Sequence, residues 1–109
     1  MLTFGAYQAA AKLTAIYPDN IKVTYPALGL AGEAGEICNK VKKIFRDDNG
    51  VVSDERREQL RKEIGDVVWY VAALCSDLQL DLGDVVRENI DKLHSRYVRG
   101  KISGDGDER

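Results

Sequence analysis

Two pairs of acidic residues in this 109-residue chain occupy the same helical register, 30 positions apart. Glu33 and Glu36 form the first pair, and Glu63 and Asp66 form the second. Residues three positions apart lie on one face of an α-helix, so each pair presents two neighbouring carboxylates. If the two helices pack antiparallel, four carboxylates converge and repel one another unless a cation lies between them. Oxygen ligands of this kind favour a hard ion such as Mg²⁺, which indicates phosphate chemistry.

Each acidic pair borders the apolar stripe of its helix. A rotation of about 100° per residue puts Glu33 and Glu36 beside the stripe that runs from Leu30 to Ile44, and not opposite it. The same arithmetic applies to the second pair. A single acidic pair is common on the solvated face of a helix in a chain with 31% charged residues. Two pairs in identical register, both beside a core face, favour a site over surface charge.

These side chains need helices to position them, and the apolar periodicity predicts four, over residues 3–17, 26–46, 53–80 and 81–97. No stretch alternates for long enough to build a β-sheet. We therefore expect an all-α fold, with residues 1–100 as one four-helix bundle-like domain and residues 101–109 as a polar, glycine-rich tail. The residues expected to face the core are Leu2, Ala6, Ala9, Leu13 and Ile16; Leu30, Ala34, Ile37, Val41 and Ile44; Leu60, Ile64, Val67, Val71, Leu74 and Leu78; and Val86, Ile90, Leu93 and Tyr97.

The third predicted helix is apolar on every side from Val67 to Leu74. A helix of this kind is buried on more than one face. In so small a domain a second buried face indicates another subunit, so we expect an obligate homo-oligomer. Gly29, Gly32 and Gly35 lower the stability of the second helix, which suggests that another helix or a ligand approaches it closely.

A polar and basic stripe lies beside the apolar stripe of the fourth predicted helix. Asn89, Lys92 and Arg96 follow one another at spacings of three and four, so they share a face. Next to an acidic metal site, these groups and Lys40 would bind the phosphate oxygens that the metal leaves free. The alternatives are a solvated face, or basic residues that favour the C-terminal end of a helix.

The composition narrows the classes of function. A formal net charge of −2 gives no general attraction to nucleic acid or to membranes. Two cysteines, Cys38 and Cys75, without a Cys-x-x-Cys motif indicate reduced thiols. We read neither a secretory signal nor an apolar stretch of the roughly 18 residues that a membrane span needs, so we expect a cytoplasmic protein.

The acidic motifs and their contexts resemble those of the MazG-like nucleotide pyrophosphohydrolases, within the all-α NTP pyrophosphatase superfamily. The contexts are GLAGEAGE at the first motif and KEIGDVVWYVAAL at the second, and the basic pattern of the fourth helix is similar as well. The resemblance covers residues 4–99. It implies a dimer or tetramer with helices from more than one subunit around each site. It also implies hydrolysis of a nucleoside triphosphate to the monophosphate and pyrophosphate, with Mg²⁺, or Mn²⁺ as a substitute, held by Glu33, Glu36, Glu63 and Asp66.

The resemblance further assigns residues to the substrate. Lys40, Asn89, Lys92 and Arg96 are the candidates for the triphosphate. The candidates for the base or sugar are Tyr7, Gln8 and Trp69. The tail ISGDGDER is similar to the ending of some small relatives. If it is ordered over a neighbouring site, it would bring Arg109 to the phosphates.

Two other functions suit a helical chain. A di-iron carboxylate protein would carry two Glu-x-x-His motifs, whereas the only histidine here lies in Asp91-x-x-His94. A non-catalytic helical interaction module on the same scaffold would tolerate the loss of acids, and all four are present. We therefore expect a Mg²⁺-dependent triphosphate pyrophosphohydrolase, with the interaction module as the alternative.

Overall fold

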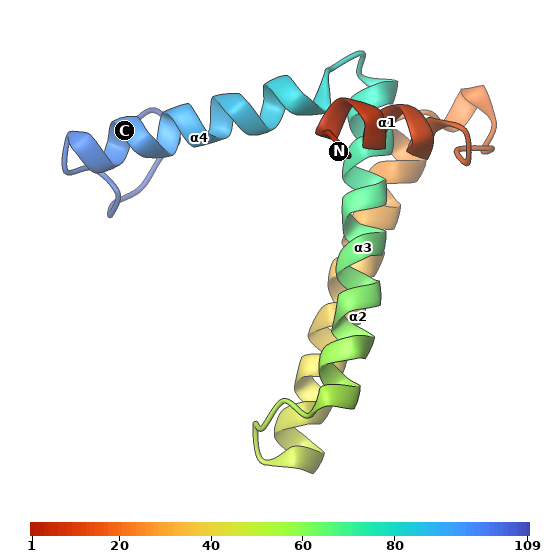
Figure 1. Ribbon diagram of the computed structural model, residues 1–109, viewed down its shortest axis with the longest axis vertical. Helices are drawn as coiled ribbons and strands as arrows, with labels where there is room; N and C mark the ends of the chain where they lie inside the picture. Colours follow the sequence, from red (N-terminus) through yellow and green to blue (C-terminus); the bar gives the residue numbers. More distant parts are fainter.

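The computed structural model describes residues 1–109 and contains helices without strands. Four α-helices, α1 (Phe4–Lys12), α2 (Thr24–Asp48), α3 (Asp54–Asp77) and α4 (Leu82–Val98), are accompanied by a short 3-10 helix, η1 (Asp19–Ile21). Figure 1 shows α2 and α3 as one long antiparallel hairpin, with α1 across its upper end. The all-α prediction is thereby confirmed. No helix is long and apolar enough to span a membrane.

Helix α1 ends earlier than the periodicity predicts, at Lys12 and not at Tyr17. The hydroxyl of Thr14 donates to the carbonyl of Ala11 at 2.8 Å, and this local bond competes with the next helical turn. Pro18 adds to the effect, because the residue before a proline avoids the helical region. The released segment carries the chain to α2, which has Pro26 buried in its first turn.

The α2–α3 hairpin is set by a short connection with suitable caps. Asn49 and Gly50 adopt left-handed conformations, with φ of 54° and 77°, and end α2. Ser53 then caps α3, where its hydroxyl accepts from the backbone N–H of Arg56 at 3.1 Å. The Arg56 guanidinium also reaches back to Asp48, with Nε 3.0 Å from the carboxylate. These contacts fix the register in which the two acidic motifs meet.

The buried core of the chain is small and lies where α1, α3 and the start of α4 meet. Its members are Ala11, Ala72, Cys75 and Leu82, with Tyr7, Trp69, Val71, Val85 and Val86 packed against them. Only 8 of the 109 residues are buried. Both cysteines are free thiols, with Cys75 in this core and Cys38 exposed. A core of this size leaves much of the apolar surface uncovered.

Helix α4 does not pack along the hairpin but projects away from it at a steep angle (Figure 1). The radius of gyration is 16.9 Å, against about 13 Å for a compact chain of this length. Of the expected inward residues of α4, Val86 packs on the core, whereas Ile90, Leu93 and Tyr97 are uncovered, with Ile90 63% and Tyr97 75% exposed. Leu2, Leu13 and Ile16 are also exposed. The prediction of a four-helix bundle within one chain is therefore wrong, since α4 does not pack along the other helices. Apolar periodicity identifies which face of a helix is apolar, but it does not identify what covers that face.

Candidate metal and phosphate site

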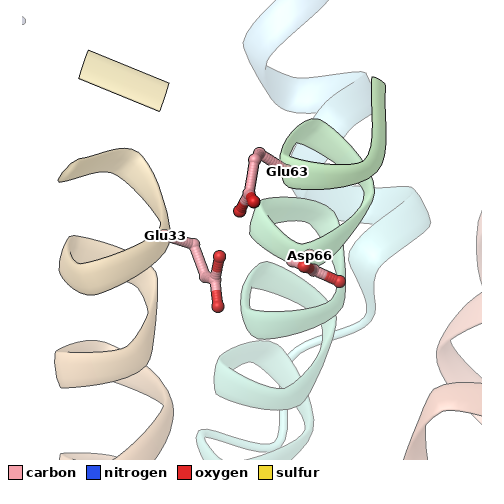
Figure 2. A group of neighbouring side chains, drawn as sticks. All are labelled: Glu33, Glu63 and Asp66. Atoms are coloured by element: carbon pink, nitrogen blue, oxygen red, sulfur yellow. The ribbon is translucent and has the colours of Figure 1, made fainter. Parts of the chain in front are cut away.

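Three of the four predicted acids converge between the helices of the hairpin. Glu33 reaches from α2 towards Glu63 and Asp66 on α3 (Figure 2), and one carboxylate oxygen of each lies within 4.8 Å of the others. The antiparallel arrangement causes this meeting, because each motif lies in the middle part of its helix and faces the other. The shared register of the two motifs in the sequence thus becomes a shared location in space.

Glu36, the fourth predicted acid, lies outside this cluster. It is exposed on α2, one turn beyond Glu33, and acts on Glu33 through its charge. The spacing of three residues separates the two carboxylates by about 60° around the helix, enough for one to face α3 and the other solvent. The expectation of four acids around one point is therefore met by three within a single chain.

The acid cluster carries unbalanced negative charge. The pKa of Glu33 is raised, first by a hydrogen bond with Glu63, then by partial burial and by repulsion from Asp66, Glu63 and Glu36. A shared proton between two carboxyl groups is the expected response when charges of the same sign are held close together. The nearest cation is the ammonium of Lys40, with Nζ 3.8 Å from Glu63 Oε1. Lys40 therefore lies at the cluster, where the sequence predicted a phosphate ligand.

The donor atoms fit a hard divalent cation. Mg²⁺ binds oxygen ligands at about 2.0–2.1 Å, so two ligands of one ion are at most about 4 Å apart, and the observed spacing needs only side-chain adjustment. No histidine or cysteine joins the group. This composition differs from zinc sites, which usually include cysteine or histidine, and from di-iron carboxylate sites, which combine glutamates with histidines.

A row of aromatic side chains borders the acids, and only part of this row was expected from the sequence. Tyr17 and Tyr25 stack with ring centroids 4.6 Å apart, and Tyr25 lies 6.3 Å from Tyr70. Burial chiefly raises the pKa of Tyr70, with further contributions from Tyr25, Glu33 and Asp66. The sequence signals were Tyr70 one helical turn after Asp66 and Gly29 one turn before Glu33.

Gln8 and Trp69, predicted to contact the base or sugar, make hydrogen bonds within the chain. The amide nitrogen of Gln8 donates to Ser76 Oγ at 3.2 Å and to the Leu80 carbonyl at 2.9 Å. Its amide oxygen accepts from the Leu82 N–H at 2.8 Å. Trp69 Nε1 donates to Thr14 Oγ1 at 2.8 Å. The bonds of Gln8 with Leu80 and Leu82 attach α1 to the connection between α3 and α4, so they help to set the direction in which α4 leaves the hairpin. Tyr7 packs on the same core, and its pKa is raised by burial and then by the charge of Asp66.

The basic stripe of α4 is not brought to the acids of the same chain. Asn89, Lys92 and Arg96 lie on the projecting helix, away from the hairpin (Figure 1). Lys92 Nζ lies 2.7 Å and Arg96 Nη2 3.1 Å from a carboxylate oxygen of Asp107 in the tail. The Arg109 guanidinium donates its hydrogen bonds to backbone carbonyls of the tail. One chain therefore holds the acids and the bases of the predicted site in two separate places.

Comparison with known proteins finds one domain family and one similar phage protein. The MazG nucleotide pyrophosphohydrolase domain matches residues 24–99, from the first residue of α2 to the cap of α4. The Gene 37 protein of Mycobacterium phage L5 is 52% identical over 109 aligned positions, which cover 94% of this chain and 96% of that protein. No solved structure matches.

Proposed function

The chain belongs to the MazG nucleotide pyrophosphohydrolase family, and we propose that it hydrolyses ribo- or deoxynucleoside triphosphates to the monophosphate and pyrophosphate. The observation that carries the proposal is the meeting of Glu33, Glu63 and Asp66 within 4.8 Å. Such a cluster is electrostatically unfavourable alone and favourable around a cation that also binds phosphates. We assign Mg²⁺ to it, with Mn²⁺ as a substitute, and a role in control or cleaning of the cytoplasmic nucleotide pool.

The hairpin supplies the rigid part of the mechanism. Glu33, Glu63 and Asp66 would hold the metal, with Glu36 adding negative charge beside them. When bound, Mg²⁺ polarises phosphoryl oxygens and offsets the negative charge of the triphosphate. The two packed helices fix the positions of the carboxylates. A water molecule that accepts its orientation from one of these carboxylates can therefore approach a phosphorus atom in line with the departing pyrophosphate.

The remaining phosphate charge calls for basic groups, and we assign this role to Lys40, Lys92 and Arg96, with Asn89 beside them. Lys40 already lies at the acids. The residues of α4 point away from the acids of their own chain, so the site that we propose combines the acids of one copy with α4 of another. The exposed apolar residues of α4 support this homo-oligomer, because Ile90, Leu93 and Tyr97 would otherwise face water. A dimer or a tetramer could each combine the acids of one copy with α4 of another. Gln8 and Trp69 remain our candidates for the base or sugar, alongside the hydrogen bonds that they make within the chain.

The test is pyrophosphate release from a panel of ordinary and altered nucleoside triphosphates, with and without Mg²⁺. We expect Mg²⁺-dependent release from at least one triphosphate, and release roughly 100-fold slower or more from the same substrate with the Glu63→Gln chain. If no triphosphate gives metal-dependent release, the enzyme assignment is wrong and a non-catalytic helical scaffold remains. The panel also identifies the preferred base and sugar.

A further inference from the structure

The C-terminal tail, residues 101–109, is folded back on the end of α4 (Figure 1). Gly104 and Gly106 have φ of 119° and 84°, which residues with a side chain rarely adopt, so the loop needs glycine at these positions. The Arg109 guanidinium closes the loop. It donates to the carbonyls of Lys101, Ile102 and Gly106 at 3.1, 3.0 and 2.6 Å. The tail is therefore a built turn, and its own residues hold its shape.

This closed loop presents Asp107 to the basic stripe. Lys92 Nζ donates to Asp107 Oδ1 at 2.7 Å, and Arg96 Nη2 donates to the same oxygen at 3.1 Å. Arg96 Nη2 also donates to the backbone carbonyl of Asp107. One carboxylate oxygen and one carbonyl oxygen thus lie together beside two cations, as two oxygens of a phosphate group would.

Arg96 is only partly satisfied by this contact. Its side chain is 6% exposed, so it has lost most of its hydration. All of its side-chain hydrogen bonds are donated by Nη2, while Nε is buried without a partner. A guanidinium presents its donors as a planar fork that matches two oxygens of a carboxylate or phosphate. Asp107 leaves the Nε donor of this fork unused, and a phosphate group has a further oxygen that could accept from it.

We propose that Asp107 is an intramolecular competitor for the polyphosphate of the substrate, and that the tail must leave Lys92 and Arg96 before these residues bind it. This inference rests on the proposed function, because it takes the basic pair as the phosphate subsite. Arg109 then acts through Asp107: it holds the loop closed and does not contact phosphate. The measured affinity for a polyphosphate is the intrinsic affinity multiplied by the fraction of chains with the tail displaced.

The full chain bound to inorganic tripolyphosphate, measured by calorimetry at fixed Mg²⁺, tests the proposal without any hydrolysis. We expect Asp107→Asn to bind tripolyphosphate about 10-fold more tightly than the unaltered chain. Asp105→Asn removes the same charge from an exposed position on the same tail, and it should change the affinity less than about 2-fold. If both variants bind tripolyphosphate more tightly by the same factor, net charge explains the effect and the proposal is overturned.

In a third variant, the effect of charge and the effect of tail opening on anion affinity have opposite signs. Arg109→Ala removes a positive charge, which by itself weakens anion binding, but it also opens the tail. The proposal predicts tighter binding of tripolyphosphate, whereas a direct contact of Arg109 with phosphate predicts weaker binding. Weaker binding by Asp107→Asn would likewise overturn the proposal, because it would mean that the carboxylate positions the basic pair for phosphate.

The tail can also be followed directly. In ¹H–¹⁵N spectra of the unaltered chain, tripolyphosphate should move the amide signals of Gly104 and Gly106 towards their positions in Asp107→Asn. Binding that leaves these signals unchanged, or no binding by any of the chains, overturns the inference. Failure of the enzyme assignment is a separate result: tripolyphosphate would then displace the tail while no nucleotide releases pyrophosphate.

Discussion

The ring of Tyr70 lies directly against the backbone of Gly29, so closely that a Cβ added to Gly29 would be 2.1 Å from Tyr70 Cε1. This contact joins α3 to α2 one turn from the acid cluster. It explains one of the three glycines that the sequence identified as points of close approach. Gly32 and Gly35 have nothing within 4 Å of an added Cβ in this chain.

The first prediction follows from that contact. Gly29→Ala should destabilise the chain by about 2 kcal/mol or more, although alanine favours a helix, because the aromatic ring has to move. Thermal unfolding measures the effect. Gly5→Ala in α1 is the matched control, since its Cβ would meet nothing nearer than 4.0 Å; it should leave the melting temperature equal or slightly higher. An unchanged melting temperature for Gly29→Ala would contradict the contact.

The second prediction concerns the acids of α3. Glu63→Gln and Asp66→Asn should each lower Mg²⁺-dependent pyrophosphate release by roughly 100-fold or more. Mutation of a residue that only hydrogen-bonds to a metal ligand typically costs about 10- to 100-fold in activity, and loss of a ligand itself should cost at least as much. The fold should persist by circular dichroism, because the change relieves repulsion between carboxylates. Glu58→Gln, an exposed glutamate on the same helix, is the control and should keep full activity. Unfolding of either variant would make the acids structural.

The third prediction is a pH dependence of the metal-free chain. The pKa of Glu33 is raised above the ordinary value of 4.5, so the folded chain binds this proton more tightly than the unfolded chain does. The destabilising effect of the Glu33 charge is therefore present at neutral pH and disappears as the pH falls through the raised pKa. Without metal, Glu33→Gln should melt above the unaltered chain at pH 7, and the difference should shrink towards pH 4.5. A difference that grows on acidification would contradict the shared proton.

The fourth prediction separates a structural Gln8 from a substrate-binding one. Gln8→Leu leaves the N–H of buried Leu82 without its acceptor and removes two further bonds. Stability should fall by about 2–3 kcal/mol in denaturant titrations, because an unpaired buried donor costs about 1–3 kcal/mol. An unchanged unfolding curve together with a raised KM would assign Gln8 to the substrate site.

The fifth prediction tests the site shared between copies. Glu63→Gln and Lys92→Ala should each be weakly active alone, and co-expression of the two chains should restore part of the activity. Restoration is expected because one of the two sites in a mixed pair then combines unaltered acids with an unaltered α4. Glu63→Gln mixed with Asp66→Asn is the control and should restore nothing, since both changes affect the same half. Activity of the first mixture no higher than the sum of its parts would favour a site within one chain.

Much of the local structure could be predicted from the sequence. The apolar periodicity predicted all four helices, and Thr3 and Ser53 cap α1 and α3 as N-cap residues do. The early end of α1 could not be predicted from periodicity, because it depends on the bonds of Thr14 with Ala11 and Trp69. Local signals act over one or two turns, whereas the bond between Thr14 and Trp69 joins residues 55 positions apart.

The sequence by itself determined which faces of the helices carry acids, bases and apolar groups, because a helix converts spacing into direction within a few residues. Only the tertiary structure decided which of these faces meet. It joined Glu33 to Glu63 and Asp66, left Glu36 outside, and directed Lys92 and Arg96 away on α4. It also folded the tail, so that Asp107 lies against the basic pair. The direction of a helix relative to its neighbours depends on a few long-range contacts, here those of Gln8, and no repeat in the sequence encodes them.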